Sequence, residues 1–586
     1  MSVETGDIVS RIYNGFRGVD FRGEEINLVR SPDSLNVWRD YKHTDSIRTR
    51  PGMKLLNSFD APIYGIFFYR ASGTDMMLVH SGTKLYKVVN GVKTELYSGL
   101  KAAQSDSFIY NSVWYFKDGA HYLKYDGKTV KAVEEEAYIP TTSIGRRVYA
   151  DDTLGSDILV KTTHGGAIHE DVNLLQTKRK NEFVLEDVAS GSYGSPLEIY
   201  LELDAQNIDE DFTPVVLHKE KKVTPTSIDY EKGQIRLTMT QASVTEGDTF
   251  AVEFKKAVKG YTDRIHKCTL LQVFDNRVFF SGNPDYPNVV YHCSLNDPAY
   301  VSDLDYYNEG LDSAAVKGLV AGNNALWVFR EPSQANTSVF YHTPTIDSEY
   351  GKIYPSQHSS ITLGCVGKAI NFNDDIIFFS ERGMEGISGD ITTEQAVAHR
   401  SALVDRKLLA LADYKKMVLE EWEGYLIVFI GNKAFLADSR AVYTNENHVE
   451  YEFFYWEMSK DIVSARVDGG ILYLGTADGV YTLTDNDCAI ESYWVTPKDK
   501  FGVPHKLKTT NKRGCIVEAT GDISVYAKIE DTDFELIGEY KNITDYFTSR
   551  IKRKKFKDIQ LKFHSNTRFS LETATLEVFI GGYIKR

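Results

Sequence analysis

Apolar and polar residues alternate along most of this chain, in pairs of short runs that a turn separates. The clearest example is the segment 469–485, GGILYLGTADGVYTLTD, in which two alternating runs flank the turn Ala477-Asp478-Gly479. Alternation with a period of two around an Asp-Gly turn is a strong signal of a β-hairpin. We therefore predict two antiparallel strands in this segment.

The same hairpin pattern recurs along the chain. Its copies begin at Thr74, Ser112, Asn276, Asn324, Asp375, Gly424 and Gly469. From Asn276 onward they start roughly 45 residues apart, which is the length of a four-stranded propeller blade. Because a single blade cannot bury both of its faces, a closed ring of blades is needed to make one core. The pattern predicts a mainly β protein built on a β-propeller of roughly six to eight blades, with about seven as the best count.

Two parts of the chain break the blade pattern. The pattern stops after residue 133 and resumes at 266, and the gap has its own strand signals, such as PLEIYLEL at 196–203. Loops longer than about 15 residues are rarely without structure in compact proteins. We predict an inserted β-sandwich in this gap, and a separate C-terminal β-sandwich after residue 490, where short alternating runs return without the hairpin template.

These boundaries divide the chain into five predicted regions. They are an N-terminal arm at 1–59, the first part of the propeller at 60–133, the inserted β domain at 134–265, the second part of the propeller at 266–490, and the C-terminal β domain at 491–586. We expect the arm to lie over the ring and to supply a closing strand to the last blade. Apolar residues that recur on one helical face predict one helix at 394–411, on the edge of the ring.

Composition and charge narrow the class of protein. The chain has 586 residues, with 36 Tyr and 30 Phe against 15 Pro, which favours ordered β structure. Its net charge of −15 means that the surface as a whole repels nucleic acid and acidic membranes. The N-terminus has no apolar core of a secretory signal, and no segment approaches the roughly 20 apolar residues of a membrane span. We therefore predict neither a secretory signal nor a membrane span.

The cysteines are few and far apart. They are Cys268, Cys293, Cys365, Cys488 and Cys515, and they form no C-x-x-C motif. An odd number of widely spaced cysteines predicts buried, reduced thiols in a protein made in a reducing compartment.

Motifs of common catalytic sites are missing from the sequence. We find no H-E-x-x-H, no G-x-S-x-G, no phosphate-binding loop and no G-x-G-x-x-G after a strand. The acidic pairs are Asp303 with Asp305, Asp374 with Asp375, and Asp485 with Asp487. They lie at predicted turns, where Asp is favoured by its own backbone hydrogen bonds, and this interpretation outweighs a glycosidase pair. The histidines show no ligand spacing. We predict no catalytic site, no metal and no cofactor.

Two basic runs contrast with the acidic background. They are Lys178, Arg179 and Lys180 in the insert, and Lys552, Arg553, Lys554 and Lys555 before a C-terminal strand. One interpretation is a solvated face or a charged, protected edge strand. The other is contact with a neighbouring subunit or with DNA phosphate, in which each cation acts without sequence specificity. The sequence leaves both open, and the second makes these seven residues candidates for an interface.

Several short motifs resemble one known family. Arg17-Gly18-Val19-Asp20, Ser31-Pro32-Asp33-Ser34 with Asn36 and Arg39, and Arg50-Pro51-Gly52-Met53 resemble the N-terminal signature of bacteriophage tail nozzle proteins, also called tail tubular or packaged-DNA stabilisation proteins. The segments 173–181, 281–285 and 295–298 resemble stretches of the same family. The resemblance implies a structural role for the signature residues Arg50, Pro51 and Gly52.

The resemblance also implies a function. Such a protein is a non-enzymatic virion component that forms a sixfold ring below the portal and adaptor proteins. The ring prolongs the channel for duplex DNA, and closes it until infection. The implied partners are other copies of the chain, the adaptor, tail fibre or tail-tip proteins, and DNA that passes without sequence specificity. Assembly would take place in the cytoplasm of a bacterial host, and the insert and the C-terminal domain would make the subunit contacts.

Two other functions compete with this one. A glycan-binding or glycan-cleaving propeller is suggested by the aromatic content of 12% and by Tyr-rich turns such as Asp305-Tyr306-Tyr307. Cleavage would need a pair of convergent carboxylates in the central mouth of the propeller. A cellular interaction platform of the WD type is disfavoured, because no Gly-His or Trp-Asp dipeptide recurs across the blades.

Overall fold

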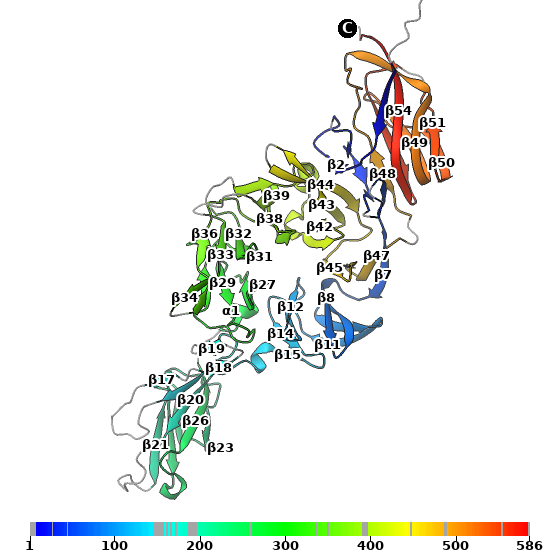
Figure 1. The fold of residues 1–586 in the computed structure, drawn as a ribbon. Helices are drawn as coiled ribbons and strands as arrows, with labels where there is room; N and C mark the ends of the chain where they lie inside the picture. Colours follow the sequence, from blue (N-terminus) through cyan, green and yellow to red (C-terminus); the bar gives the residue numbers. More distant parts are fainter. Residues whose placement is uncertain are drawn as a thin grey trace, which may run out of the picture.

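The structure is a computed structural model, and β-strands dominate it (Figure 1). It describes residues 8–25, 27–40, 42–43, 45–144, 157–159, 162–164, 167–169, 173–185, 196–256, 261–333, 337–348, 351–388, 396–445, 448–485, 489–552 and 555–583. Its short helices are α1 (Asp263–His266), α2 (Asp405–Leu408), and the 3-10 turns Val133–Glu135, Gln241–Ser243 and Tyr414–Lys416. In these ranges no helix has the length and apolar character needed to cross a membrane.

Within these ranges, seven four-stranded antiparallel sheets form a ring (Figure 1). The first three blades are β8 (Ile63–Ala71), β9 (Thr74–Ser81), β10 (Lys84–Val89) and β11 (Val92–Ser98); β12 (Asp106–Tyr110), β13 (Val113–Lys117), β14 (Tyr122–Tyr125) and β15 (Val130–Ala132); and β27 (Leu270–Phe274), β28 (Arg277–Ser281), β29 (Val289–His292) and β30 (Tyr306–Asn308). The next three are β31 (Val316–Gly322), β32 (Ala325–Arg330), β33 (Val339–His342) and β36 (Ser356–His358); β37 (Ala369–Phe372), β38 (Asp375–Ser380), β39 (Gly383–Ile387) and β40 (Val397–His399); and β41 (Val418–Trp422), β42 (Tyr425–Ile430), β43 (Lys433–Asn445) and β44 (His448–Glu457). The last is β45 (Ser464–Asp468), β46 (Ile471–Gly475), β47 (Gly479–Thr484) and β7 (Gly52–Ser58).

The predicted hairpins are the second and third strands of each blade. In the last blade, for example, Leu474 of β46 lies opposite Tyr481 of β47. This arrangement confirms the β-propeller and the count of about seven blades. The fourth strand of the last blade is β7, which comes from the N-terminal side of the ring and pairs Gly52 with Thr484. The predicted closing strand is therefore confirmed, and it ties the two ends of the ring together.

The insert between the second and third blades is a two-sheet sandwich. One sheet holds β17 (Asp157–Leu159), β16 (Thr141–Ile144), β20 (Lys178–Val184), β26 (Thr249–Lys255), β22 (Val215–His218) and β23 (Lys221–Val223); the other holds β21 (Leu197–Glu202), β25 (Gln234–Met239) and β24 (Ser227–Asp229). A separate hairpin pairs β18 (Thr162–His164) with β19 (Ala167–His169). Strands of both sheets alternate buried and half-buried residues, as in β25, and they share a core made only of insert residues. The inserted sandwich is thus confirmed.

The C-terminal domain is built on one eleven-stranded sheet that also takes up N-terminal strands. Its C-terminal members are β48 (Ser492–Val495), β49 (Lys506–Ile529), β50 (Glu535–Ile543), β51 (Tyr546–Ser549), β52 (Lys555–Phe556), β53 (Ile559–Ser565) and β54 (Phe569–Tyr583). Its N-terminal members are β1 (Ile8–Tyr13), β4 (Ser34–Leu35), β5 (Val37–Trp38) and β6 (Ile47–Thr49). Two further pairs are β2 (Gly18–Val19) with β3 (Arg30–Ser31), and β34 (Thr345–Asp347) with β35 (Gly351–Ile353).

We expected the N-terminal segment to lie over the ring as an arm, but four of its strands lie in the C-terminal sheet instead. β1 runs antiparallel to β54, with Ile8 opposite Phe579 and Tyr13 opposite Ala574. The long strand β54 offers a row of backbone hydrogen-bonding groups that a short strand can satisfy, and Tyr13 buries its ring at the same time. Pairing with the C-terminal sheet therefore accounts for β1, β4, β5 and β6, whereas β2 and β3 pair with each other and β7 completes the last blade.

The helix predicted at 394–411 is wrong for the residues that the structure describes. Val397–His399 forms β40, the outer strand of the fifth blade, and the helical part is limited to α2. Val404 and Leu408 are buried, so their spacing reflects one helical turn and not a long helix. Pairing with β39 outweighs helix propensity here, because an unfinished blade would leave backbone groups without partners.

Four cysteines lie in the described ranges, and all of them are buried free thiols: Cys268, Cys293, Cys365 and Cys515. Burial raises the pKa of each of these thiols to about 12. The prediction of buried reduced thiols is confirmed for these four, whereas Cys488 lies outside the described residues.

Candidate functional site

The propeller and the C-terminal domain meet at a joint made by the N-terminal segment. We call it the C-terminal joint: residues 17–50 where they contact β44 of the sixth blade and β48 of the C-terminal sheet. At its centre, Asn36 accepts hydrogen bonds through Oδ1 from the backbone N–H of Glu457 (2.8 Å) and from Nε of Arg50 (2.8 Å). Its Nδ2 donates to the carbonyl of Glu491 (2.9 Å). One amide side chain thus connects three segments that are far apart in the sequence.

Two buried arginines complete the polar part of this joint. Arg50 donates from Nη2 to the carbonyl of Glu457 (2.7 Å) and from Nη1 to the carbonyl of Pro51 (2.8 Å). Arg30 of β3 makes a bidentate ion pair with Glu452 of β44, at 2.8 Å and 2.7 Å. Bidentate pairing between a guanidinium and a carboxylate fixes geometry as well as charge.

A glycine permits the close approach of β2 to β44. Gly18 of β2 has a φ of +139°, and a Cβ there would lie 2.0 Å from the carbonyl oxygen of Phe453 in β44. No side chain fits at that distance, so this position requires glycine for space as well as for its backbone conformation.

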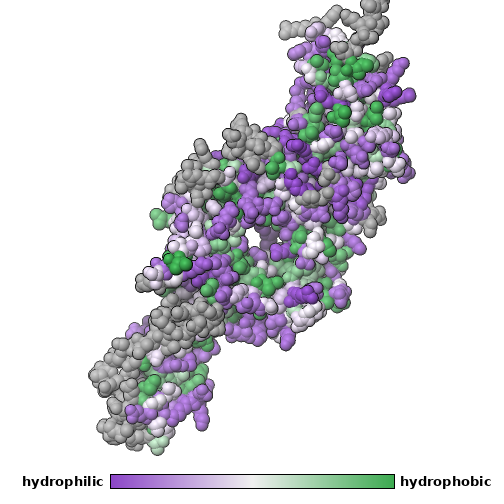
Figure 2. Space-filling view, viewed as in Figure 1, coloured by the Kyte–Doolittle hydropathy of each residue, from purple (hydrophilic) through white to green (hydrophobic). Residues whose placement is uncertain are grey.

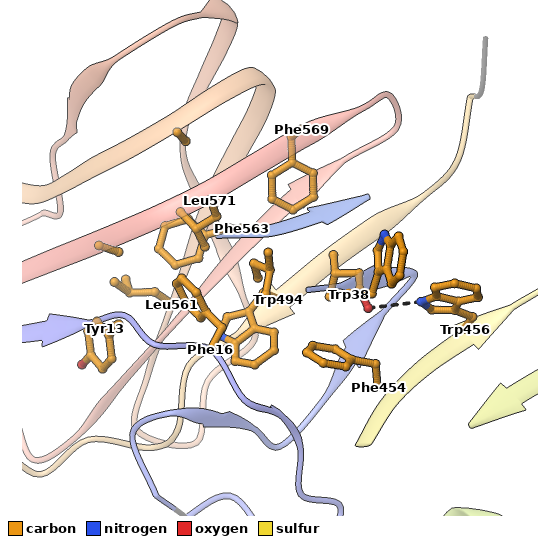
Figure 3. Packing of buried hydrophobic residues seen from close by; sticks show 14 of the residues in the cluster. Tyr13, Phe16, Trp38, Phe454, Trp456, Trp494, Leu561, Phe563, Phe569 and Leu571 are labelled. Atoms are coloured by element: carbon orange, nitrogen blue, oxygen red, sulfur yellow. Dashed lines mark hydrogen bonds between the residues drawn. The ribbon is translucent and has the colours of Figure 1, made fainter. Parts of the chain in front are cut away.

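The apolar part of the joint is one continuous core (Figure 3). Trp38 of the N-terminal segment stacks on Trp422 of the sixth blade, with ring centroids 5.3 Å apart, and meets Trp456 edge-on at 5.6 Å. The indole Nε1 of Trp456 donates to the carbonyl of Val37 (3.3 Å), the dashed line in Figure 3. Trp494 and Phe563 of the C-terminal domain belong to the same core. The propeller and the C-terminal domain are therefore joined by the packing of one shared core.

The insert is held to the third blade by a second joint, which we call the insert joint: Asn173 of the insert and its contacts with the loop between β29 and β30 of the third blade. Asn173 is fully buried, and its Nδ2 donates to the carbonyls of Tyr138 (3.2 Å) and Ala299 (3.0 Å). Its Oδ1 accepts from the backbone N–H groups of Leu175 (3.0 Å) and Val301 (3.1 Å). A single side chain again satisfies backbone groups on both sides of a domain boundary.

Asn283 plays a similar part beside the insert joint. It is buried in the loop after β28, and its Nδ2 donates to the carbonyls of Asp263 (3.1 Å) and Arg264 (2.9 Å). These carbonyls belong to α1, the segment through which the chain returns from the insert to the ring. The motifs that resemble the nozzle family thus fall at the two joints.

The basic run of the insert is paired within the insert. Lys178 makes an ion pair with Glu253 (2.8 Å), and Lys180 makes one with Glu182 (2.6 Å). Arg179 binds Asp204, with Nε to Oδ2 at 2.7 Å, and is largely buried. The three side chains lie on β20 next to strands β16 and β26, so part of their charge is used inside the sandwich. Their role at an interface stays a prediction.

The second basic run lies on the C-terminal domain. Lys552 and Lys555 are exposed, and Lys555 begins the short strand β52, which pairs with β49. Arg553 and Lys554 lie outside the described residues. This run presents at least two exposed cations on the surface, which agrees with either interpretation of the sequence.

A cavity of about 630 Å³ lies at the centre of the ring, where Figure 2 shows a hollow in the surface. The innermost strands of all seven blades line it: β8, β12, β27, β31, β37, β41 and β45. The walls combine apolar and neutral polar side chains, such as Tyr64, Leu271 and Gln272.

Five charged side chains line this cavity, and one of them, Lys317, pairs with Glu331 (3.4 Å); the other four are Asp106, Lys368, Glu420 and Arg466. Asp106 and Glu420 each accept a backbone hydrogen bond, from Ser107 (2.8 Å) and from Val467 (3.2 Å). Within the described residues, no carboxylate lies in ion-pair contact, 4.0 Å or less, with Lys368 Nζ or the Arg466 guanidinium. Charges of both signs therefore face the same space without direct contact.

The enclosure shifts the titration of these groups. Burial raises the pKa of Glu420 to about 7, against the effect of Arg466 and of the Val467 N–H group. Burial likewise raises the pKa of Asp106 and lowers the pKa of Lys368, whose positive charge Asp106 and Glu420 partly stabilise. The side chain of Asp106 nevertheless remains exposed to water, and Glu420 and Lys368 are half-exposed, so the charged groups of the cavity are only partly desolvated.

The described members of the acidic pairs seen in the sequence do not line the cavity, and Asp487 lies outside the described residues. Asp375 pairs with Arg400 (2.9 Å), Asp303 accepts from the hydroxyl of Tyr261 (3.3 Å), and Asp485 pairs with Arg568. The cavity residues were missed because each stands alone in its own strand. A usable signal would have been a charged residue in the first strand of a blade, just before the repeated hairpin.

No group of three or more His, Cys, Asp or Glu residues is placed to hold a metal ion in the part of the chain that the structure describes. Other pockets lie at the C-terminal joint, about 340 Å³, and between the fourth and fifth blades, about 720 Å³.

Comparison with known proteins gives no relative from which a function could be transferred. No family model matches the chain, and no curated protein matches it. Among solved structures, BamB from Moraxella catarrhalis is 11% identical over 74% of this chain and 98% of its own, with a TM-score of 0.30. A glutaminyl cyclase from Myxococcus xanthus is 10% identical over 36% and 87%, with a TM-score of 0.20. An exo-β-1,3-galactanase from Phanerochaete chrysosporium is 9% identical over 93% and 99%, with a TM-score of 0.19. At such TM-scores these likenesses support no argument about function.

Proposed function

We propose that this chain is the ring-forming subunit of a bacteriophage tail nozzle. Copies of it form a sixfold ring below the portal and adaptor proteins. The ring extends the DNA channel, retains the packaged DNA and lets it leave on infection. This role is structural and involves no catalysis.

The observation that carries the proposal is the location of the family-like motifs. Gly18, Asn36 and Arg50 lie in the C-terminal joint, and Asn173 and Asn283 lie at the insert joint. Figure 1 shows the C-terminal domain and the insert projecting from different sides of the propeller. In a ring every subunit must present the same surfaces in the same directions, because one interface geometry is repeated around the axis. Joints with buried, directional hydrogen bonds meet that need.

Charge also supports the proposal. The net charge of −15 suits a channel wall along which DNA slides, because acidic walls make few phosphate contacts. Exposed cations such as Lys552 and Lys555 are then available for acidic surfaces of neighbouring subunits, the adaptor or fibre proteins. The buried free thiols suit assembly in a bacterial cytoplasm, with the virion tail as the final location.

The mass and symmetry of the purified protein test this proposal. Light scattering should give about 400 kDa, six times the chain mass of 66.2 kDa, and negative-stain averages should show a sixfold ring with an open bore. The measurement is made on the purified protein alone and again after the adaptor protein has been added as a template for assembly. A monomer at micromolar concentration in both conditions would overturn the proposal and favour the alternative, a glycan-binding or glycan-cleaving propeller.

A matched pair of variants tests the role of the C-terminal basic run. Charge reversal at Lys552 and Lys555 should weaken the ring if these side chains contact a neighbouring subunit. Lys415→Glu, which changes an exposed lysine on the propeller, serves as the control. Equal ring stability in both variants would remove the C-terminal run from the interface without affecting the proposal of a ring.

A further inference from the structure

The central cavity of the propeller has features that a structural ring subunit does not require. A ring needs outer surfaces that fit its neighbours, whereas this cavity is enclosed by the innermost strands of one subunit. Four of its five charged side chains come from four different blades: Asp106 from the second, Lys368 beside β37 of the fifth, Glu420 from the sixth and Arg466 from the seventh. Charges placed this way are brought together only when the ring closes.

The four charged groups face one another across the cavity without direct contact. Lys368 is electrostatically coupled to both carboxylates, and Arg466 is also coupled to both, so the four groups face a common space. Yet no pair of them is in ion-pair contact, as described above. Because Asp106 and Arg466 are exposed to water in the cavity and the four groups make no direct ion pair among the described residues, their side chains keep hydrogen-bonding capacity for a molecule that enters.

The balance of charge indicates what could occupy the space. Above about pH 7, where Glu420 is ionised, two carboxylates and two cations cancel, and the fifth charged residue of the lining, Lys317, is already paired with Glu331 (3.4 Å). An anionic or cationic ligand would leave one sign in excess. A neutral ligand with many hydroxyl groups can instead donate to the carboxylates and accept from the cations at the same time, through charge-assisted hydrogen bonds.

Size and the remaining lining agree with such a ligand. A volume of about 630 Å³ falls within the range of small-molecule sites, roughly 300–1,000 Å³. Tyr64 and Leu271 offer apolar surface, and Gln272 offers both a donor and an acceptor. A sugar ring combines apolar faces with hydroxyl groups around its edge, so it matches both kinds of surface.

We propose that the central cavity is a binding site for a neutral, hexose-sized carbohydrate unit, held by Asp106, Lys368, Glu420 and Arg466. The site belongs to a single subunit, and it goes beyond the nozzle function, because it requires only the closed propeller and not the assembled ring.

Binding of single sugars to the full chain tests the site. The probes are glucose, galactose, mannose and N-acetylglucosamine, with glucuronate and glucosamine as charged molecules of similar size. Saturation-transfer NMR followed by titration calorimetry should show saturable binding of at least one neutral sugar. The charged sugars should bind roughly tenfold more weakly, because each leaves an unbalanced charge in the cavity.

Paired substitutions then locate the binding. Glu420→Gln and Arg466→Gln should each weaken the sugar by roughly tenfold, since each removes a charge-assisted hydrogen bond. Glu421→Gln is the matched control, because its side chain is exposed on the same strand and does not line the cavity. Circular dichroism and the unfolding midpoint establish that each variant is folded. Arg466 is exposed to water within the cavity, so Arg466→Gln is the variant that should disturb the packing of the propeller least.

Three results would overturn the inference. They are no saturable binding of any neutral sugar up to about 50 mM, a preference for glucuronate or glucosamine, and sugar binding that is unchanged in both Glu420→Gln and Arg466→Gln. None of these results depends on the oligomeric state, so the proposal of a nozzle is tested separately.

Discussion

Arg30 and Glu452 form a buried, bidentate ion pair between the N-terminal segment and the sixth blade, although 422 positions separate them in the sequence. The two hydrogen bonds, at 2.8 Å and 2.7 Å, join β3 to β44 inside the C-terminal joint. Because Glu452 is fully buried, its ionised carboxylate is stable there only when an arginine pairs with it.

Removing this arginine should therefore destabilise the protein strongly. Arg30→Ala leaves the Glu452 carboxylate buried without its bidentate partner, and we expect the free energy of unfolding to fall by about 3–5 kcal/mol. The control is Arg70→Ala, which removes an exposed pair with Asp75 and should cost at most about 1 kcal/mol. Denaturant unfolding measures both variants, and equal losses would show that burial of the Arg30 pair is unimportant.

The glycine in β2 gives a second test of the C-terminal joint. In Gly18→Ala the new Cβ would overlap the carbonyl of Phe453, so we expect β2 to separate from β44, with a loss of about 1–3 kcal/mol. Limited proteolysis should cut the segment 17–35 faster than in the unchanged protein. Gly23→Ala is the control, because a methyl group added there would have no atom of another segment within 4 Å. Equal cleavage rates in the two variants would contradict the close packing of β2.

The separate core of the insert predicts a local loss of stability. Leu237→Ala should destabilise the insert by about 2–5 kcal/mol, since it empties space in a core that only insert residues form. Hydrogen exchange should rise in the insert strands while the blades keep their protection. By contrast, Leu474→Ala affects the core that the propeller shares with the C-terminal domain, so exchange should rise in both of these. Loss of protection throughout the blades in Leu237→Ala would show that the insert is not an independent unit.

His399 should make stability depend on pH. Burial lowers the pKa of this imidazole, but hydrogen bonds to Asp405 (2.6 Å) and Glu385 (3.2 Å) outweigh burial and raise the pKa to about 10. Because the folded pKa lies above the ordinary value of 6.5, the stabilisation is fully present below pH 6.5 and is lost as the pH rises towards about 10.

A variant comparison measures this dependence. The difference in unfolding free energy between the unchanged protein and His399→Gln should be largest near pH 6.5 and should shrink steadily as the solution becomes more alkaline. His505→Gln is the control, because His505 is exposed and makes no ion pair with a carboxylate among the described residues. A difference for His399→Gln that stays constant across this range would rule out a charged imidazole between the two carboxylates.

The features of this fold that depend on local pattern could be predicted from the sequence alone. Alternation around turns such as Asp478-Gly479 predicted each hairpin, and their repetition predicted the propeller, because a strand pair is specified by residues that are neighbours in the chain. The interruption of the repeat predicted the insert. The local pattern gave a wrong prediction at Val397–His399, where a helical pattern forms strand β40 because pairing with β39 completes the blade.

Features that depend on contacts between distant residues could not be predicted from the sequence and became visible in the folded chain. The N-terminal segment pairs with β54 and packs against β44 because those strands offer backbone groups and apolar surface that no local pattern reveals. Asp106 and Glu420 share one cavity only because the ring closes, and Lys178 uses its charge on Glu253 only because β20 and β26 are neighbours. Periodicity encodes which residues face a sheet, whereas ion pairs and cavities depend on which strands meet, and that is fixed by packing of the whole chain.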